Sequence, residues 1–329
     1  MISDHVSISP SKISWLFIYV IKLLSIVFFI IVMFGPFLIA CSGNLPNPAV
    51  SEASSVTSII GPDYRSRGAA AYDCLEEMHV SSSGCKVTYT YFKPRERSND
   101  VLVILGHGFM RSKKRMAPLA GHLASWGLPV VNLEFCNSKF WAGNHDLNGA
   151  DMVAVAQKIH TGKVIYVGFS AGGLAAILAT HLDHNTLAFF GLDMVDNKGL
   201  GKEKAPNLMV PMYGLMAAPS ACNAKNNGLD IYALASQSKV MEVMDSSHCH
   251  FEFPVDGKCS LVCGRGEKRL SRETIQQTIV GLTTAFLLWQ SGIDPNGETW
   301  WSERQLNYVS LREAGYINEP IINETVLDR

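Results

Sequence analysis

The sequence has little charge and no excess of either sign. Charged residues make up 17% of the 329 residues, and the formal net charge at pH 7 is −1. Proteins that bind nucleic acid usually carry a basic patch or stripe, and no basic stripe occurs along this chain. We therefore expect no nucleic acid among its partners. Because 47% of the residues are hydrophobic, the chain can bury the core of one large domain.

Two further patterns are missing. The eight cysteines include no Cys-x-x-Cys pair, the spacing that is typical of structural zinc sites, so we predict no metal site. No internal repeat occurs either, which excludes a solenoid or a propeller.

The N-terminal part differs in composition from the rest of the chain. Residues 15–40 are almost wholly apolar, and Leu38-Ile39-Ala40 precedes Cys41. This predicts a signal peptide or a membrane anchor over residues 1–40. Cys41 resembles the lipidated cysteine of a bacterial lipoprotein, which implies an exported protein anchored on the periplasmic or cell-surface side. The alternative is an uncleaved transmembrane helix, because the apolar run is long enough to span a bilayer.

Three segments follow. Residues 41–60 are rich in Pro, Ser, Asn and Ala and predict a flexible linker, 61–290 predict one domain, and 291–329 predict a tail packed on it. In the tail, Trp300 and Trp301 pack on the domain or, alternatively, border a substrate cleft. In an exported protein the remaining cysteines suggest disulfides. From proximity along the chain we expect the pairs Cys74–Cys85, Cys259–Cys263 and Cys222–Cys249, with Cys136 left over, although spacing does not determine connectivity.

Strand and helix patterns alternate through the predicted domain. Strands are expected at 87–92, 101–105, 129–133, 164–167, 187–192, 208–215 and 239–244, and helices at 116–126, 149–160 and 271–289. This alternation predicts a doubly wound, mostly parallel α/β sheet with helices on both faces.

The segment Gly168-Phe169-Ser170-Ala171-Gly172-Gly173 joins a predicted strand to a predicted helix of small residues. A sharp strand-to-helix turn with serine at its apex is the context of a Gly-x-Ser-x-Gly nucleophile elbow. Gly168 and Gly172 leave room where the two backbones approach each other. We therefore predict Ser170 as a nucleophile.

A serine nucleophile needs a base that an acid orients, and in this motif the chain order is serine, acid, histidine. His248 and His250 follow the last expected strand, at the carboxyl edge where ligands bind in open α/β sheets. We choose His248 as the base. His250 is the alternative, and its other role would be that of a surface histidine or of one that supports the site from outside.

The acid is expected between the serine and the histidine. The loop after the strand at 208–215 contains no carboxylate as far as Asn223, whereas Asp193 directly follows the strand before it. Asp193 is therefore the predicted acid. Asp196 is the alternative, and its other role would be to cap or turn the loop.

An oxyanion needs backbone N–H donors. One comes from the residue after the nucleophile, Ala171, and the other from Phe109, in the loop after the strand at 101–105. His107 comes too early in the chain to be the base and is expected to buttress that loop. Phe109, Phe169 and Trp141 suggest an apolar acyl pocket.

Four segments together resemble a known family. They are His107-Gly108-Phe109, Gly168–Gly173, Gly191–Asp196 and Ser247-His248-Cys249, and they resemble the chlorophyllase-like branch of the α/β-hydrolases. Dienelactone hydrolases and cutinase-like polyester hydrolases are related to this branch. The resemblance covers residues 86–290 and implies the α/β-hydrolase fold.

The resemblance also bears on the acid. In chlorophyllases the acid lies in a Leu-Asp-Pro-Val segment, which Leu192-Asp193-Met194-Val195 matches with Met194 in place of proline. This implies that Asp193 is the acid. Ala171, where the family has a polar residue, and the cysteine-rich loops depart from the family and leave the substrate open.

These observations predict a serine hydrolase of small-molecule or polymeric carboxylic esters that uses no cofactor and works as a monomer. The alternatives are a peptidase or thioesterase of the same fold, or a non-catalytic binding protein on a hydrolase scaffold.

Overall fold

Nine strands form one sheet in the computed structural model, which describes residues 59–81, 84–96, 100–139 and 143–320. Their order across the sheet is β1-β2-β4-β3-β5-β6-β7-β8-β9. The strands are β1 (Tyr72–Val80), β2 (Lys86–Pro94), β3 (Val101–Gly106), β4 (Val130–Leu133), β5 (Lys163–Phe169), β6 (Thr186–Leu192), β7 (Met212–Met216), β8 (Ser238–Val243) and β9 (Ile317–Asn318).

The middle of the sheet is parallel and its margins are antiparallel. The strands from β4 to β8 pair in parallel, whereas β1–β2, β2–β4 and β8–β9 pair antiparallel. All six residues of β3 are buried, as a strand covered on both faces requires. The predicted fold class is therefore confirmed: this is a single α/β domain, consistent with an α/β-hydrolase-like fold.

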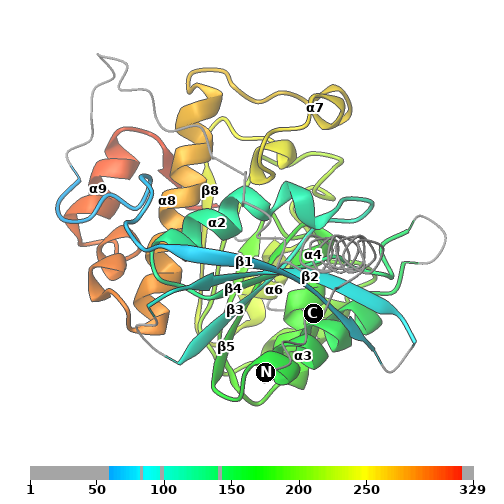
Figure 1. The fold of residues 1–329 in the computed structure, drawn as a ribbon. Coiled ribbons are helices and arrows are strands. Elements are labelled where there is room, and N and C mark those ends of the chain that lie inside the picture. The colour runs from blue at the N-terminus through cyan, green and yellow to red at the C-terminus, as the bar shows by residue number, and fades with distance from the viewer. Residues whose placement is uncertain (1–58, 82–83, 97–99, 140–142, 321–329) are drawn as a thin grey trace, which may run out of the picture. The chain divides into compact units, whose positions relative to one another are not determined.

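Helices cover both faces of the sheet (Figure 1). On one face α2 (Ala117–Ser125) and α8 (Arg272–Ser291) pack in one apolar cluster. On the other face α3 (His145–Ile159), α4 (Ala171–Leu182) and the shorter α6 (Leu229–Leu234) pack in a second cluster. The short helix α5 (Leu200–Lys204) contacts α4 and α6. The other helical segments are η1 (Lys113–Arg115), η2 (Ala205–Asn207), η3 (His248–Phe251), α7 (Gly257–Cys263), η4 (Pro295–Trp300) and α9 (Leu306–Glu313).

The segment after α8 packs back on that helix. Trp300 and Trp301 are buried in the cluster that contains α8, and the Trp301 indole N–H donates to the Leu282 carbonyl. Tyr308 and Leu311 of α9 belong to the same cluster. The two tryptophans are thus core residues and do not border a cleft.

The two largest shifts of a predicted boundary, four residues each, have local reasons. Helix α3 begins at His145 and not at 149, because the Asn144 side chain caps it by accepting the Leu147 N–H. Strand β7 begins at Met212 and not at 208, because residues 205–207 form η2 and Pro211 has no N–H to give to a ladder.

The disulfides also differ from the predicted pairs. The structure contains Cys85–Cys136, Cys222–Cys263 and Cys249–Cys259, so the three predicted pairings are wrong and Cys136 is not left over. Sheet register explains the first pair. Tyr89 of β2 lies opposite Leu133 of β4, so the antiparallel pairing carries Cys85, before Tyr89, to Cys136, after Leu133.

Some predictions fall outside the described residues. They are the signal peptide or anchor at 1–40, lipidation of Cys41, most of the linker at 41–60, and the role of Trp141. In the part that the structure describes, no helix is long and apolar enough to cross a membrane.

Candidate active site

Ser170 lies at the turn between β5 and α4, in the left-handed region with φ 54° and ψ −123°. The backbone segments around this turn lie so close together that they leave no room for a Cβ at positions 168 and 172. A Cβ on Gly168 would lie 2.1 Å from the Gly172 carbonyl oxygen, and one on Gly172 would lie 2.4 Å from the His107 carbonyl oxygen. Only glycine fits at both positions, so the Gly-x-Ser-x-Gly pattern is a steric requirement of this turn.

The structure brings the predicted nucleophile, base and acid together in one hydrogen-bonded row. The Ser170 Oγ lies 3.0 Å from Nε2 of His248, and Nδ1 of His248 lies 2.6 Å from Oδ2 of Asp193. Ser170 follows β5, Asp193 follows β6, and His248 begins η3 after β8, so all three lie at the carboxyl edge of the sheet.

The Asp193 carboxylate is buried, with 1% of the residue exposed, and is held by donors on several sides. Its Oδ1 accepts the Ala217 N–H at 2.9 Å, and the Asn223 amide lies 3.3 Å from each carboxylate oxygen. These donors fix the position of the carboxylate. The carboxylate accepts the Nδ1–H of His248, which leaves the lone pair of Nε2 facing the Ser170 hydroxyl.

No sequence pattern predicts the role of Asn223, because a polar residue in a turn has many roles. Its side chain is completely buried, and its Nδ2 also donates to the Ala218 carbonyl. The side-chain oxygen accepts the Ser220 N–H at 2.7 Å. Asn223 is therefore fixed in an orientation that presents its amide to Asp193.

The alternative acid has a different role in the structure. The Asp196 carboxylate accepts the N–H groups of Gly201 and Lys202, at the start of α5, and makes no hydrogen bond to His248. It thus caps the helix.

His250 faces a different set of partners from His248. Its Nδ1 accepts the Ser247 N–H at 3.0 Å, and its Nε2 lies 3.2 Å from Glu267. Burial lowers the pKa of His250, while Glu267 acts in the opposite direction. The side chain completes a capping box for η3, the segment that begins with His248, and so supports the base from outside the site.

The two predicted oxyanion donors lie on elements that meet at Ser170. A Cβ on Gly108 would lie 3.3 Å from the Ser170 Cβ, so the loop that carries Phe109 lies against the nucleophile. Ala171 is the first residue of α4, where helix N–H groups lack intrahelical partners. Within the described residues, neither the Phe109 nor the Ala171 N–H donates a backbone hydrogen bond. Both are available to a substrate oxygen.

His107 supports the Phe109 loop. Its Nε2 accepts the Phe135 N–H at 3.0 Å, which places the ring proton on Nδ1, and that N–H donates to the Gly108 carbonyl at 2.7 Å. Burial lowers the pKa of His107, so the ring stays neutral and keeps this tautomer.

A second support for this loop was also not found from the sequence. Arg111 forms a bidentate ion pair with the fully buried Glu252 and a 2.8 Å ion pair with Asp256. The hydrogen bonds to Glu252 raise the pKa of the guanidinium. Because Glu252 follows η3 directly, these ion pairs join the Phe109 loop to the segment that carries His248.

Of the aromatic residues predicted for an acyl pocket, Phe169 is 2% exposed and packs on the His248 ring with centroids 4.7 Å apart. It belongs to the core. Phe109 is 37% exposed and is the one described member of that set that presents a surface to solvent.

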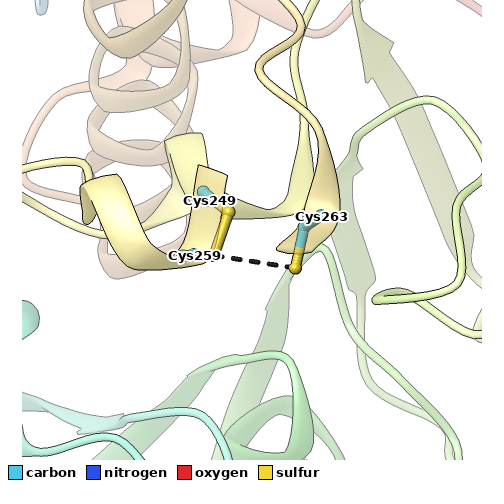
Figure 2. A group of neighbouring side chains, drawn as sticks. All are labelled: Cys249, Cys259 and Cys263. Carbon is cyan, nitrogen blue, oxygen red and sulfur yellow. Dashed lines mark hydrogen bonds between the residues drawn. A yellow bond between two sulfur atoms is a disulfide. The ribbon is translucent and has the colours of Figure 1, made fainter. Parts of the chain in front are cut away.

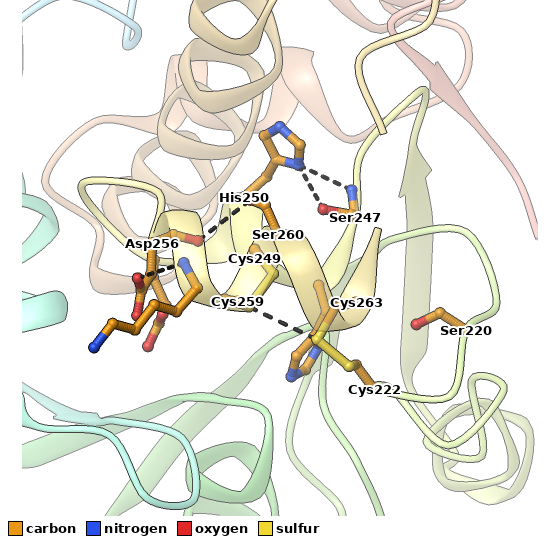
Figure 3. The surroundings of a disulfide bond; sticks show 12 residues. Ser220, Cys222, Ser247, Cys249, His250, Asp256, Cys259, Ser260 and Cys263 are labelled. Carbon is orange, nitrogen blue, oxygen red and sulfur yellow. Dashed lines mark hydrogen bonds between the residues drawn. A yellow bond between two sulfur atoms is a disulfide. The ribbon is translucent and has the colours of Figure 1, made fainter. Parts of the chain in front are cut away.

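Disulfides flank the acid and base side of the site. Cys222 precedes Asn223 and is bonded to Cys263, and Cys249 follows His248 and is bonded to Cys259 (Figure 3). The sulfurs of Cys249, Cys259 and Cys263 lie close together (Figure 2), with the Cys259 and Cys263 sulfurs 3.8 Å apart. A metal is bound by thiolates, and in this structure these sulfurs are in disulfides.

Fold and site together define a class: an α/β-hydrolase-like domain with serine, histidine and aspartate in contact at the carboxyl edge of its sheet. Comparison of the chain with protein-family models and with the curated proteins gives no match.

Proposed function

We propose that the protein is a serine hydrolase of carboxylic esters that works through an acyl-enzyme. The observation that carries the proposal is the row of contacts from Ser170 through His248 to Asp193, with distances of 3.0 Å and 2.6 Å. A lone Ser–His contact would be weak support. The buried carboxylate on Nδ1 supplies the orientation and the charge that a catalytic histidine needs.

In the proposed mechanism the Ser170 Oγ attacks the ester carbonyl while His248 Nε2 takes its proton. The negative charge that develops on the carbonyl oxygen is stabilised by the N–H groups of Ala171 and Phe109. His248 then gives the proton to the leaving alcohol, which leaves an acyl group on Ser170. Water, deprotonated by His248, releases the acid and restores the serine. Asp193 stabilises the imidazolium in both steps.

The likeness to the chlorophyllase-like branch supports esters over peptides, and the position of Asp193 at the end of β6 fits the segment in which that branch places its acid. It does not select an ester, because specificity resides in loops, and the loops of this chain carry cysteines that the family lacks.

We also propose that the domain is exported. Three disulfides lie within the described residues, and disulfides persist in oxidising compartments. A membrane tether through the N-terminal residues remains a prediction, as does lipidation of Cys41. Mass spectrometry of the mature chain, with Cys41→Ser as control, tests the lipid: a lipid mass on the wild type alone supports it.

The test of the activity is turnover of a series of p-nitrophenyl esters by the wild type and by Ser170→Ala. We expect turnover by the wild type and a loss of about a thousandfold or more in the variant. Equal rates in the two proteins, or no turnover with any chain length, would refute the esterase. A thioester and a peptide p-nitroanilide in the same assay show whether either alternative reaction is faster.

A further inference from the structure

The helix α7 carries the two most exposed large hydrophobic side chains of the described residues. Leu261 is 80% exposed and Val262 is 81% exposed. They are neighbours in sequence, and we call them the α7 tip. Isolated exposed apolar residues are common on protein surfaces, but two adjacent ones at this exposure on a short helix are not explained by packing.

Helix α7 is not held in place by a hydrophobic face, since none of its residues is buried. Its fixed points are the disulfides of Cys259 and Cys263 (Figure 3) and the Asp256 carboxylate, which pairs with Arg111 at 2.8 Å and Arg115 at 3.2 Å. The cysteines bind the helix to the domain, and the α7 tip between them is left in solvent. An amphipathic helix that packs on its own protein has the opposite arrangement.

The charges around the α7 tip are mainly positive. Residues 256–269 contain four basic and two acidic residues, a formal net charge of +2, while the whole chain carries −1. The two acidic groups are engaged, Asp256 by arginines and Glu267 by Arg272 and His250. All four basic residues, Lys258, Arg265, Lys268 and Arg269, are exposed, and Arg269 donates to the Gly315 carbonyl.

We propose that the α7 tip docks on an anionic lipid surface, with Leu261 and Val262 inserted at the interface and the surrounding cations facing the headgroups. Exposed apolar residues framed by lysine and arginine are the features that interfacial elements use on such surfaces. The phosphates of a nucleic acid would pair with the cations but would leave Leu261 and Val262 without an apolar partner.

Docking here would hold the carboxyl edge of the sheet near the lipid. Both disulfides of α7 end next to residues of the site, one beside His248 and the other beside Asn223. The inference does not rest on the chemistry of Ser170 and can hold or fail without it.

Local protection from amine acylation tests the proposal in the full chain, whatever its N-terminal residues do. The protein is bound to vesicles of phosphatidylcholine alone or mixed with phosphatidylglycerol, and the labelling rate of each lysine is measured by mass spectrometry. We expect labelling of Lys258 and Lys268 to be about fivefold slower on the anionic vesicles, because both approach the headgroups. Lys163, at the opposite end of β5, should show no difference and serves as the internal reference.

Three variants separate the causes. The double variant Leu261→Asp/Val262→Asp should lose the protection. Met209→Asp should keep it, because Met209 is 70% exposed but precedes β7, whereas α7 is bonded to segments that follow β7 and β8 at the opposite edge of the sheet. Ser170→Ala should keep it as well. Equal labelling on both vesicle types, or protection that persists in the double variant, would overturn the proposal. Protection by an acidic peptide but not by anionic vesicles would assign the surface to a protein partner and overturn it too.

Discussion

Ser170 and His248 belong to two sides of the site that are held in place by different means. On the serine side, backbone touches backbone: glycines at 168 and 172 let β5, α4 and the His107 segment approach each other. On the histidine side, side chains and disulfides hold the segments together. Asn223 donates to Asp193, Arg111 pairs with Glu252, and disulfides bind Cys222 and Cys249 to α7.

The two sides also differ in how far apart along the chain their residues lie. The serine side is encoded mostly within residues 163–182, where a buried strand and a helix of small residues follow each other. The histidine side joins segments that are far apart, because Asp193, Asn223 and His248 come from three separate loops. We therefore expect the serine side to depend on local sterics and the histidine side to respond to single side chains and to reductant.

The largest effect is expected from the acid. Asp193→Asn should lower kcat about ten-thousandfold, because an amide no longer holds the histidine in the tautomer that faces Ser170. Asp196→Asn, which alters the helix-capping carboxylate, should leave kcat within a fewfold of the wild type. Steady-state kinetics on one short ester measures both, and a comparable loss in the two variants would contradict the assignment of Asp193.

A smaller effect is expected from the disulfide beside the base. Cys249→Ser/Cys259→Ser should lower kcat about tenfold, since the residue after His248 is no longer anchored to α7, and should lower stability by about 3 kcal/mol. The control Cys85→Ser/Cys136→Ser opens a longer ring, of sequence separation 51 against 10. It should therefore lower stability at least as much but kcat less. Equal losses of kcat at matched stability would show that the site does not depend on this bond.

Asn223 is expected to have a more specific effect. Asn223→Ala removes an N–H donor that helps to hold the Asp193 carboxylate in place against His248. We predict a fall in kcat of about fivefold with little change in KM.

Asn226→Ala is the matched control for that variant. Asn226 is a buried amide in the same loop and donates to the Ala217 carbonyl, without contact to Asp193. A fall in kcat of the same size in both variants would show that the effect comes from the loop and not from Asn223 as a positioning residue.

The smallest effect on activity is expected from His122 of α2, which belongs to neither side and acts on stability. Burial lowers its pKa to about 4, while in the unfolded chain it keeps its ordinary value of 6.5. Between these two pH values the unfolded chain binds more protons. The contribution of His122 to stability is therefore complete above pH 6.5 and is lost as the pH falls toward 4, by up to about 1.4 kcal/mol per pH unit.

His122→Gln keeps an N–H donor for the Tyr64 carbonyl and removes the titration. Urea unfolding at several pH values should show a shallower decline of stability in the variant between pH 6.5 and 4. The same slope in both proteins would exclude this origin of the acid sensitivity.

The sequence is informative where structure is local. Continuous apolar runs predict the central parallel strands, and Ser271, whose side chain caps α8 by accepting the Thr274 N–H, marks the beginning of that helix. The elbow is predictable because its glycines are sterically required. The order of serine, acid and histidine then selects the three side chains that the structure places in contact.

Long-range pairings were not predictable in the same way. The bond between Cys85 and Cys136 depends on the register of β2 against β4, and the ion pair of Arg111 with the buried Glu252 joins residues 141 positions apart. No local pattern marks Asn223, because a polar residue in a turn has many roles. Its partner Asp193 becomes its neighbour only when β6 and β7 pair and bring their following loops together.

Covalent trapping of the nucleophile tests the central claim most directly. The full chain is incubated with an alkyl fluorophosphonate, which modifies serines that a histidine activates. Peptide mass spectrometry then locates the adduct. The account predicts one adduct, on Ser170, that forms much more slowly in His248→Ala and does not form in Ser170→Ala. No adduct on the folded wild type, or an adduct on another serine that persists in Ser170→Ala, would contradict it.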